Sequence, residues 1–174
     1  FIYMYHLFSL PAENMLVIFK LINDIILFIV SVILFQIIIS RSKDTIKALL
    51  SSLLFLMLMS QVWAQSGYSE LYSLLFMSLA YYVIVNHRYR FSSYIIIGLL
   101  YSLSTLINQG TVIFIIAVLL SESVLNNKRN YLRKMTYMGI GFVVPHLLFL
   151  VFYLINGLLD VYLATFLTIP FGYI

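Results

Sequence analysis

The sequence predicts an all-α protein, a polytopic transmembrane helical bundle of about six spans with short outer loops. Composition is the first observation: 63% of the 174 residues are apolar and only 9% are charged, whereas soluble domains carry roughly 25% charged residues. Mean hydropathy is +1.06. The second observation is the order of residues along the chain: apolar runs alternate with short polar stretches, and no linker separates two domains. We therefore expect residues 1–174 to form a single transmembrane domain.

Charged and turn residues divide the chain into the apolar runs that would be the spans. A hydrocarbon core about 30 Å thick needs about 20 helical residues, which the first and last runs provide. The middle four have about 15 to 17 residues, or roughly 22 to 26 Å at the helical rise, so they must recruit flanking residues or line a cavity. The runs cover residues 15–39, 47–63, 71–85, 93–107, 111–125 and 135–155.

Basic residues fall into three clusters, and two apolar runs separate each cluster from the next. Of the ten Lys and Arg residues, all but Lys20 belong to them: Arg41, Lys43, Lys47, Arg88, Arg90, Lys128, Arg129, Arg133 and Lys134. Because two spans separate each cluster from the next, the chain returns to the same side of the bilayer at every cluster. The positive-inside rule makes that side cytoplasmic. The net charge of +4 thus orients spans and does not indicate nucleic-acid binding. Residues 1–14, 64–70, 108–110 and 156–174 are then expected on the outer side.

Residues 93–125 raise a choice between one long helix and two helices. A single helix would reach roughly 50 Å, too long for one span, and it would place two basic clusters on opposite sides. We therefore predict an outer hairpin at Asn108, Gln109 and Gly110. Asn108 and Gln109 are candidate substrate ligands at its tip, although a turn needs such residues in any case.

The polar stretch between the second and third runs contains the main candidate site. Glu70 could accept hydrogen bonds from a sugar, with Gln65 beside it and with the ring of Tyr68 available for stacking. The alternative is that Glu70 occupies the first turn of the following helix, where a negative charge favours the dipole and Ser66 or Ser69 provides the cap.

Other polar residues have simple structural interpretations beside functional ones. Lys20 and Asp24 lie one turn apart at membrane depth, where charges are functional candidates, but the spacing also suits an i, i+4 ion pair. His6 and Glu13 belong to the outer N-terminal stretch, and His146 is expected to satisfy a local carbonyl within the last run. Cysteine is absent and no metal-binding spacing occurs, so the sequence supports no divalent metal or other cofactor.

Small residues in the last run predict a close helix contact. The stretch MGIG at residues 138–141 allows helix backbones to approach each other. It lacks the strand context of a dinucleotide-binding loop. Serines are plentiful, but none lies in a nucleophile-elbow or triad pattern, so no enzymatic motif comes from the residues alone.

The order of these features resembles the GT-C type polytopic membrane glycosyltransferases, in particular the bacterial and archaeal relatives of protein O-mannosyltransferases in family 39. An amphipathic, charge-bearing span follows an outer loop, as in FSLPAENMLVIFKLINDIILFIVSVILF. A polar outer loop then carries a glutamate, as in QSGYSELYSLLFMSLAYY. A hairpin, IIIGLLYSLSTLINQGTVIFIIAVLL, precedes a basic inner loop, and the span MGIGFVVPHLLFLVFYLINGLLD and the outer segment ATFLTIPFGYI follow.

This resemblance implies a plasma-membrane transferase that moves a sugar from a polyprenyl-phosphate-linked donor to a glycan, lipid or protein acceptor on the outer face. In the family the catalytic carboxylate lies in the first outer loop, which would precede Phe1. We therefore expect the chain to be a piece of a longer protein, and no catalytic residue is carried over. Glu70 matches a glutamate that faces the substrate chamber in relatives. Lys20 falls where many relatives have Arg, and a lysine cannot bind phosphate bidentately.

The predicted substrate-binding residues are Glu70, Gln65, Tyr68, Asn108 and Gln109. The wider chamber would add His6, Glu13, Asp160 and Tyr173. Two other classes stay open. A transporter or flippase would place charges and broken helices near mid-bilayer, and a non-catalytic membrane scaffold would not need its outer loops to converge.

Overall fold

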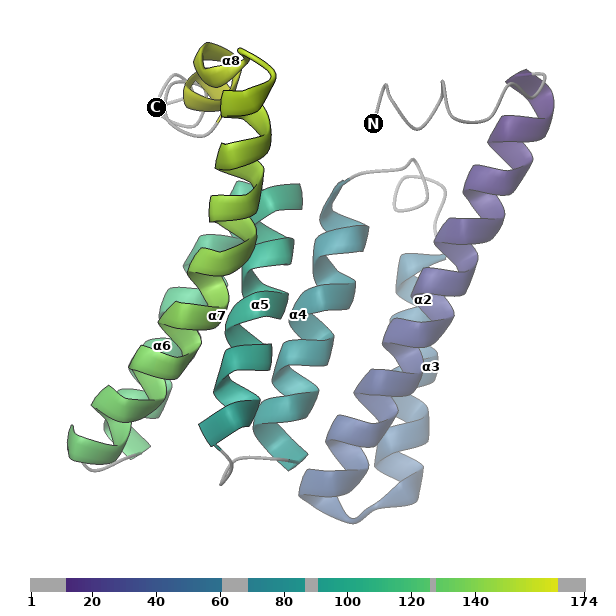
Figure 1. Cartoon of the computed structure of the whole chain (residues 1–174). Helices are drawn as coiled ribbons and strands as arrows, with labels where there is room; N and C mark the ends of the chain where they lie inside the picture. Colours follow the sequence, from purple (N-terminus) through teal and green to yellow (C-terminus); the bar gives the residue numbers. More distant parts are fainter. Residues whose placement is uncertain (1–11, 61–68, 87–90, 126–127, 166–174) are drawn as a thin grey trace. The chain divides into compact units, whose positions relative to one another are not determined.

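The structure is a computed structural model that describes residues 12–60, 69–86, 91–125 and 128–165. Every element in these ranges is a helix, as Figure 1 shows. Contacts divide the chain into two compact units, Phe1–Leu75 and Phe76–Ile174, and each is described by itself. The all-helical prediction is confirmed, while the single membrane domain stays a prediction.

Four of the predicted apolar runs lie within one helix each. Two short helices were not predicted, η1 (Gln109–Thr111) and α8 (Leu159–Leu163). Val17–Ser42 and Asn130–Ile155 are long and apolar enough to cross a membrane, and the further spans stay a prediction. The main helices are α2 (Ala12–Ser42), α3 (Thr45–Met59), α4 (Ser69–Asn86), α5 (Phe91–Ile107), α6 (Val112–Leu125) and α7 (Lys128–Ile155). The run 47–63 extends beyond α3, and its residues 61–63 lie outside the described residues, while the run 111–125 begins in η1 and continues in α6.

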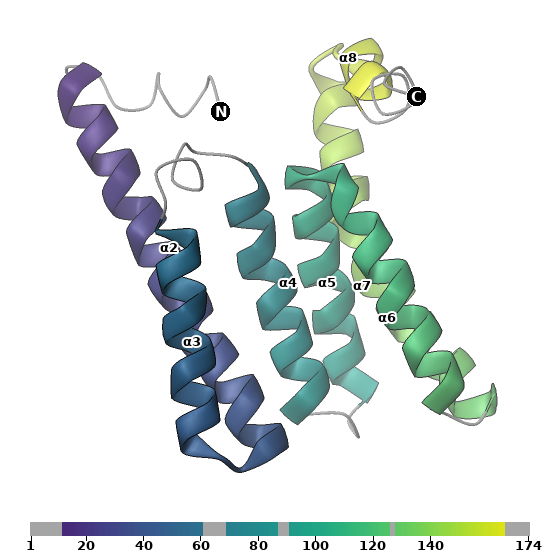
Figure 2. The same ribbon diagram turned by 180° about the vertical axis from the view of Figure 1, so that it is seen from behind.

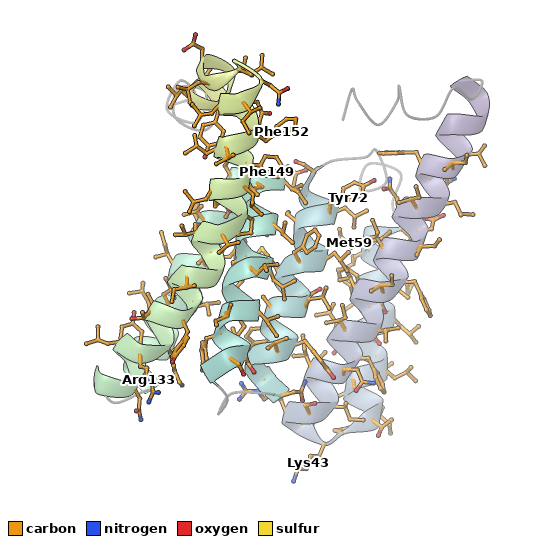
Figure 3. All side chains as sticks on the ribbon, viewed as in Figure 1. Lys43, Met59, Tyr72, Arg133, Phe149 and Phe152 are labelled. Atoms are coloured by element: carbon orange, nitrogen blue, oxygen red, sulfur yellow. The ribbon has the colours of Figure 1, made fainter. Side chains whose placement is uncertain are left out.

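A tight turn joins α2 to α3 in the first unit. Lys43 takes a left-handed conformation with φ of 55°, and its N–H donates to the Ile39 carbonyl at 2.9 Å, which closes the end of α2. Asp44 caps α3 by accepting from the Lys47 N–H at 3.1 Å. Arg41, Lys43 and Lys47 are exposed here, and Figure 3 shows Lys43 at the turn. The first basic cluster is therefore held at one end of this helical hairpin.

The carboxylate of Asp44 makes the stability of this turn depend on pH. The hydrogen bond from the Lys47 N–H and the contact with Lys47 Nζ, 3.2 Å away, lower the pKa of Asp44. A lowered pKa in the folded state stabilises the fold above the unfolded pKa, and this contribution is lost as pH falls through the folded pKa.

We expect Asp44→Ala to lower the midpoint of thermal unfolding at neutral pH and to converge with the parent protein in acid. Circular dichroism in detergent micelles at both pH values checks this. Asp44→Asn keeps a capping oxygen, so it should retain most of the midpoint but lose the pH dependence. An equal deficit of Asp44→Ala at both pH values would contradict the assignment.

Small residues also bring α3 close to α2. Ala48 is fully buried and Ser52 nearly so, one turn apart on α3. The Ser31 hydroxyl on α2 donates to the Ser52 carbonyl at 3.2 Å. Such small-residue contacts let helices approach without leaving polar groups unpaired. The apolar core of this unit is formed by Ile26, Leu27, Val30 and Leu71.

The second unit is built on the crossing of α5 and α7. A methyl group added to Gly98 would overlap the Met138 carbonyl of α7, and one added to Gly141 would overlap the Ile95 carbonyl of α5. Each glycine therefore lies directly against the backbone of the other helix. A methyl group added to Gly139 would meet no atom within 4 Å. Of the two glycines in the MGIG stretch, Gly141 makes the predicted contact. The buried core around the crossing is Ala80, Ile84, Tyr94, Ile97, Tyr101, Ile115 and Met138.

The chain reverses between α5 and α6, as Figure 2 shows. α5 ends at Ile107, η1 covers Gln109–Thr111, and α6 begins at Val112. The hairpin prediction is confirmed, and the single long helix is excluded.

The end of α7 is a Schellman motif. The Leu158 N–H donates to the Tyr153 carbonyl at 2.8 Å, and the Gly157 N–H donates to the Leu154 carbonyl at 3.1 Å. Gly157 has φ of 68°, which a glycine adopts without a steric penalty. This turn ends the long helix and directs the chain into α8.

Candidate functional site

Glu70 lies in the first turn of α4 and is exposed. Its carbonyl accepts a hydrogen bond from the Ser73 hydroxyl at 2.9 Å. An acidic residue here favours the helix dipole, so the first-turn position of the structural interpretation is confirmed, while the cap by Ser66 or Ser69 stays a prediction. The carboxylate is exposed and open to a ligand. Gln65, Tyr68, His6 and Tyr173 lie outside the described residues. Glu13 belongs to the first turn of α2, and exposed Asp160 to the first turn of α8.

Asn108 stabilises the turn between α5 and α6, which was the alternative to its predicted role as a substrate ligand. Its Oδ1 accepts from the Gly110 N–H at 2.9 Å, and its carbonyl accepts from the Thr111 hydroxyl at 2.7 Å. Gln109 reaches further, because its Nε2 donates to the Thr165 carbonyl at 2.7 Å. The hairpin tip is thereby tied to the segment that follows α8.

The predicted site residues belong to both units. Glu70 belongs to the first unit, and Asn108, Gln109 and Asp160 belong to the second. Within the second unit the structure brings Gln109 to the α8 segment, which also carries Asp160. Carboxamide, hydroxyl and carboxylate groups of this kind suit hydrogen bonding to the hydroxyls of a sugar. A chamber that Glu70 shares with Asn108 and Gln109 stays a prediction.

A buried polar pair in the first unit was missed by the sequence analysis. Asn23 is fully buried on α2, and its Oδ1 accepts from the Tyr72 hydroxyl at 2.8 Å. Lys20 and Asp24, the charged candidates on either side of it, are exposed. Asn23 precedes the core residues Ile26, Leu27 and Val30 by three, four and seven positions, which places all four on one face of a helix. This spacing could have identified Asn23 as a buried residue.

A second polar stripe runs along α5 beneath the hairpin tip. Ser102, Ser104 and Thr105 are buried there. Thr105 Oγ1 donates to the Ser102 carbonyl at 2.9 Å and lies 3.1 Å from His146 Nε2 on α7. Which of the two side chains donates in the second contact depends on the tautomer of His146. The sequence predicted a local carbonyl partner for His146, which stays a prediction, and the partner that the structure shows is Thr105 on another helix.

Ser102 differs from the other polar residues of this stripe. Its side chain is completely buried, and its hydroxyl makes no hydrogen bond within the part of the chain that the structure describes. Leaving a buried hydroxyl unpaired costs about 1 to 3 kcal/mol. Gly98, Ser102 and Thr105 recur at helical spacing, so Ser102 lies on the face of α5 that crosses α7.

Within residues 12–60, 69–86, 91–125 and 128–165, no three His, Asp or Glu side chains lie close enough together to hold a metal ion. The described polar side chains carry amide, hydroxyl, imidazole and carboxylate groups, together with the ammonium and guanidinium groups of the basic clusters, and all of these can bind polar ligands by hydrogen bonds.

Comparison with protein families, with curated proteins and with solved structures found no match. The class is consequently defined by the geometry: an all-helical protein with two helices long and apolar enough to cross a membrane. Its described polar contacts include the Asn23–Tyr72 pair of the first unit and the α5–α7 stripe and hairpin tip of the second.

Proposed function

We propose that this chain is part of a membrane glycosyltransferase of the GT-C type. It transfers a sugar from a polyprenyl-phosphate-linked donor to an acceptor on the outer face, and its basic loops are cytoplasmic. The observation that carries the proposal is the hydrogen bond from Gln109 to the Thr165 carbonyl, which joins two predicted outer segments at one end of the second unit. The order of apolar runs and polar loops, which resembles that family, adds support.

The ends of α7 support the same orientation. Basic residues including Arg133 and Lys134 lie near its N-terminus, and α8 follows its C-terminus. The uncharged part of α7, residues 135–155, separates the basic end from the polar end that holds Gln109. Positive charge on one side and hydrogen-bonding groups on the other is the distribution expected for chemistry on the outer face.

In the proposed reaction the residues of this chain bind and orient substrate. Glu70, Gln65 and Tyr68 contact the sugar or the acceptor, and Asn108 and Gln109 add hydrogen bonds at the hairpin tip. A carboxylate acting as general base takes the proton from the acceptor hydroxyl, which attacks the sugar, and the polyprenyl phosphate leaves. No residue of this chain is assigned as that base.

Glu70→Gln in the intact protein is expected to lower sugar transfer about tenfold, equivalent to about 1.4 kcal/mol of transition-state stabilisation. Transfer is measured with a radiolabelled polyprenyl-phosphate sugar in membrane vesicles. Membrane insertion should be unchanged, because the first turn of α4 is kept. Asp44→Asn is the matched control, an acid-to-amide change at the predicted inner turn, and it should retain full transfer. Parental turnover in Glu70→Gln would remove Glu70 from the site.

A transporter or flippase is the second candidate, and the buried polar contacts favour it. Asn23 with Tyr72, and Thr105 with His146, lie within long apolar helices. Polar groups at membrane depth often mark a substrate pathway. Movement of the labelled lipid-linked sugar across the vesicle membrane, with no transfer to any acceptor, would support this candidate and reject the transferase.

A further inference from the structure

An apolar groove of about 300 Å³ lies between α6 and α7. Ile115 and Leu119 line it from α6, Met135 and Phe142 from α7, and Tyr101 completes it from α5. All these residues belong to the second unit. Figure 2 shows α6 crossing in front of α7. An apolar groove of this kind needs an apolar occupant when it faces a membrane.

The groove continues toward the basic end of α7. A smaller adjoining pocket shares Leu119, Met135 and Met138 with it and extends to Tyr131 and Lys134. From Val143 to Tyr131 the two pockets follow α7 for roughly 18 Å at the helical rise. The smaller pocket has a volume of only about 10 Å³, so the groove itself would hold the hydrocarbon, and Tyr131 and Lys134 lie beyond its end.

Positive charge gathers beyond this end of the groove. Lys134 Nζ lies 5.1 Å from the centre of the Tyr94 ring, and Arg133 is exposed beside it, as Figure 3 shows. α7 begins at Lys128, followed by Arg129, and its first turn contains no acidic residue. The positive end of the helix dipole adds to these charges. An anionic group is therefore favoured here.

The lining of the groove favours an acyl chain. Apolar side chains of α5, α6 and α7 form it, and in a bilayer the surrounding medium at such a face is lipid hydrocarbon. Gly139 lines the groove, and a side chain added there would meet nothing within 4 Å. A flexible hydrocarbon chain fits this space.

We propose that the groove between α6 and α7 binds one acyl chain of an anionic phospholipid, with the phosphate at Lys134 and Tyr131. Basic pockets between transmembrane helices on the cytoplasmic side bind anionic headgroups in the same manner. The proposal requires only that the second unit lies in a membrane, and it is independent of the glycosyltransferase proposal.

Native mass spectrometry of the chain, released from nanodiscs of equal parts phosphatidylglycerol and phosphatidylcholine with identical acyl chains, tests this site. We expect one retained phosphatidylglycerol per chain and at least tenfold less phosphatidylcholine. Lys134→Gln should reduce this preference for the anionic headgroup. Equal retention of the two lipids by the parent protein would overturn the proposal.

Filling the groove provides the second arm of the test. Gly139→Leu has room for its side chain, so it should fold and should lower phosphatidylglycerol retention at least tenfold. Val144→Leu is the matched control, since Val144 is exposed on α7 and outside the groove. Val143→Phe fills the groove from its other end and should give the same loss if Gly139→Leu does not fold. A folded groove-filling variant that keeps the lipid would reject the site.

Discussion

Replacing Gly98 with alanine is expected to lower the free energy of unfolding of the second unit by about 3 kcal/mol, the upper part of the usual range for overpacking. The added Cβ would overlap the Met138 carbonyl and would lie 2.9 Å from the Phe142 nitrogen. Both are backbone atoms, which cannot rotate away as a side chain can. α5 and α7 would therefore have to separate, and contacts along the whole crossing would weaken.

Gly141→Ala should have an effect of similar size, because its Cβ would meet the backbone of α5 at Ile95 and Leu99. The two effects should be less than additive in the double variant, since one displacement of the helices relieves both overlaps. The distance between Thr105 Oγ1 and His146 Nε2, now 3.1 Å, should also increase.

Gly139→Ala is the matched control on the same helix. Its Cβ would meet nothing within 4 Å, and alanine favours a helix over glycine by up to about 1 kcal/mol. Unfolding in mixed micelles, followed by circular dichroism as the denaturing detergent fraction rises, compares the three variants. Equal stability of Gly98→Ala and Gly139→Ala would show that the helices do not approach as closely as described.

Disrupting the Asn23–Tyr72 pair is expected to cost the first unit about 1 to 2 kcal/mol, the value for a hydrogen bond between transmembrane helices. The Tyr72 hydroxyl donates to Asn23 Oδ1 at 2.8 Å, and Asn23 is fully buried. Tyr72→Phe removes the donor and leaves a buried acceptor without it. Asn23→Ala removes the acceptor and also leaves a cavity, so it should cost more.

A double-mutant cycle isolates the interaction between the two side chains. We expect a coupling free energy of about 1 kcal/mol between Asn23→Ala and Tyr72→Phe. Tyr81→Phe is the control, since Tyr81 lies on the same helix and is exposed, and it should change stability little. Strict additivity of the two substitutions would show that the hydrogen bond contributes nothing to the fold.

The sequence by itself determined the helices and where most of them end. The apolar runs between charged residues lie on helices, in which the backbone satisfies its hydrogen bonds internally. Asn108 and Gly110 broke the stretch 93–125 into a hairpin, since both residues tolerate the turn. The first-turn position of Glu70 also followed from local spacing alone.

Only the tertiary structure decided which small and polar residues meet. The residues 138–141 contain two glycines, and only the crossing of α5 and α7 distinguishes Gly141, in contact, from Gly139, in the groove. It was likewise the packing around α2 that buried Asn23 and left Lys20 and Asp24 exposed. Membrane helices are apolar on most sides, so local periodicity gives little information about which face meets a neighbour. The face that meets a neighbour depends on how each helix is rotated and on how the helices cross. Contacts between residues far apart in the sequence determine both.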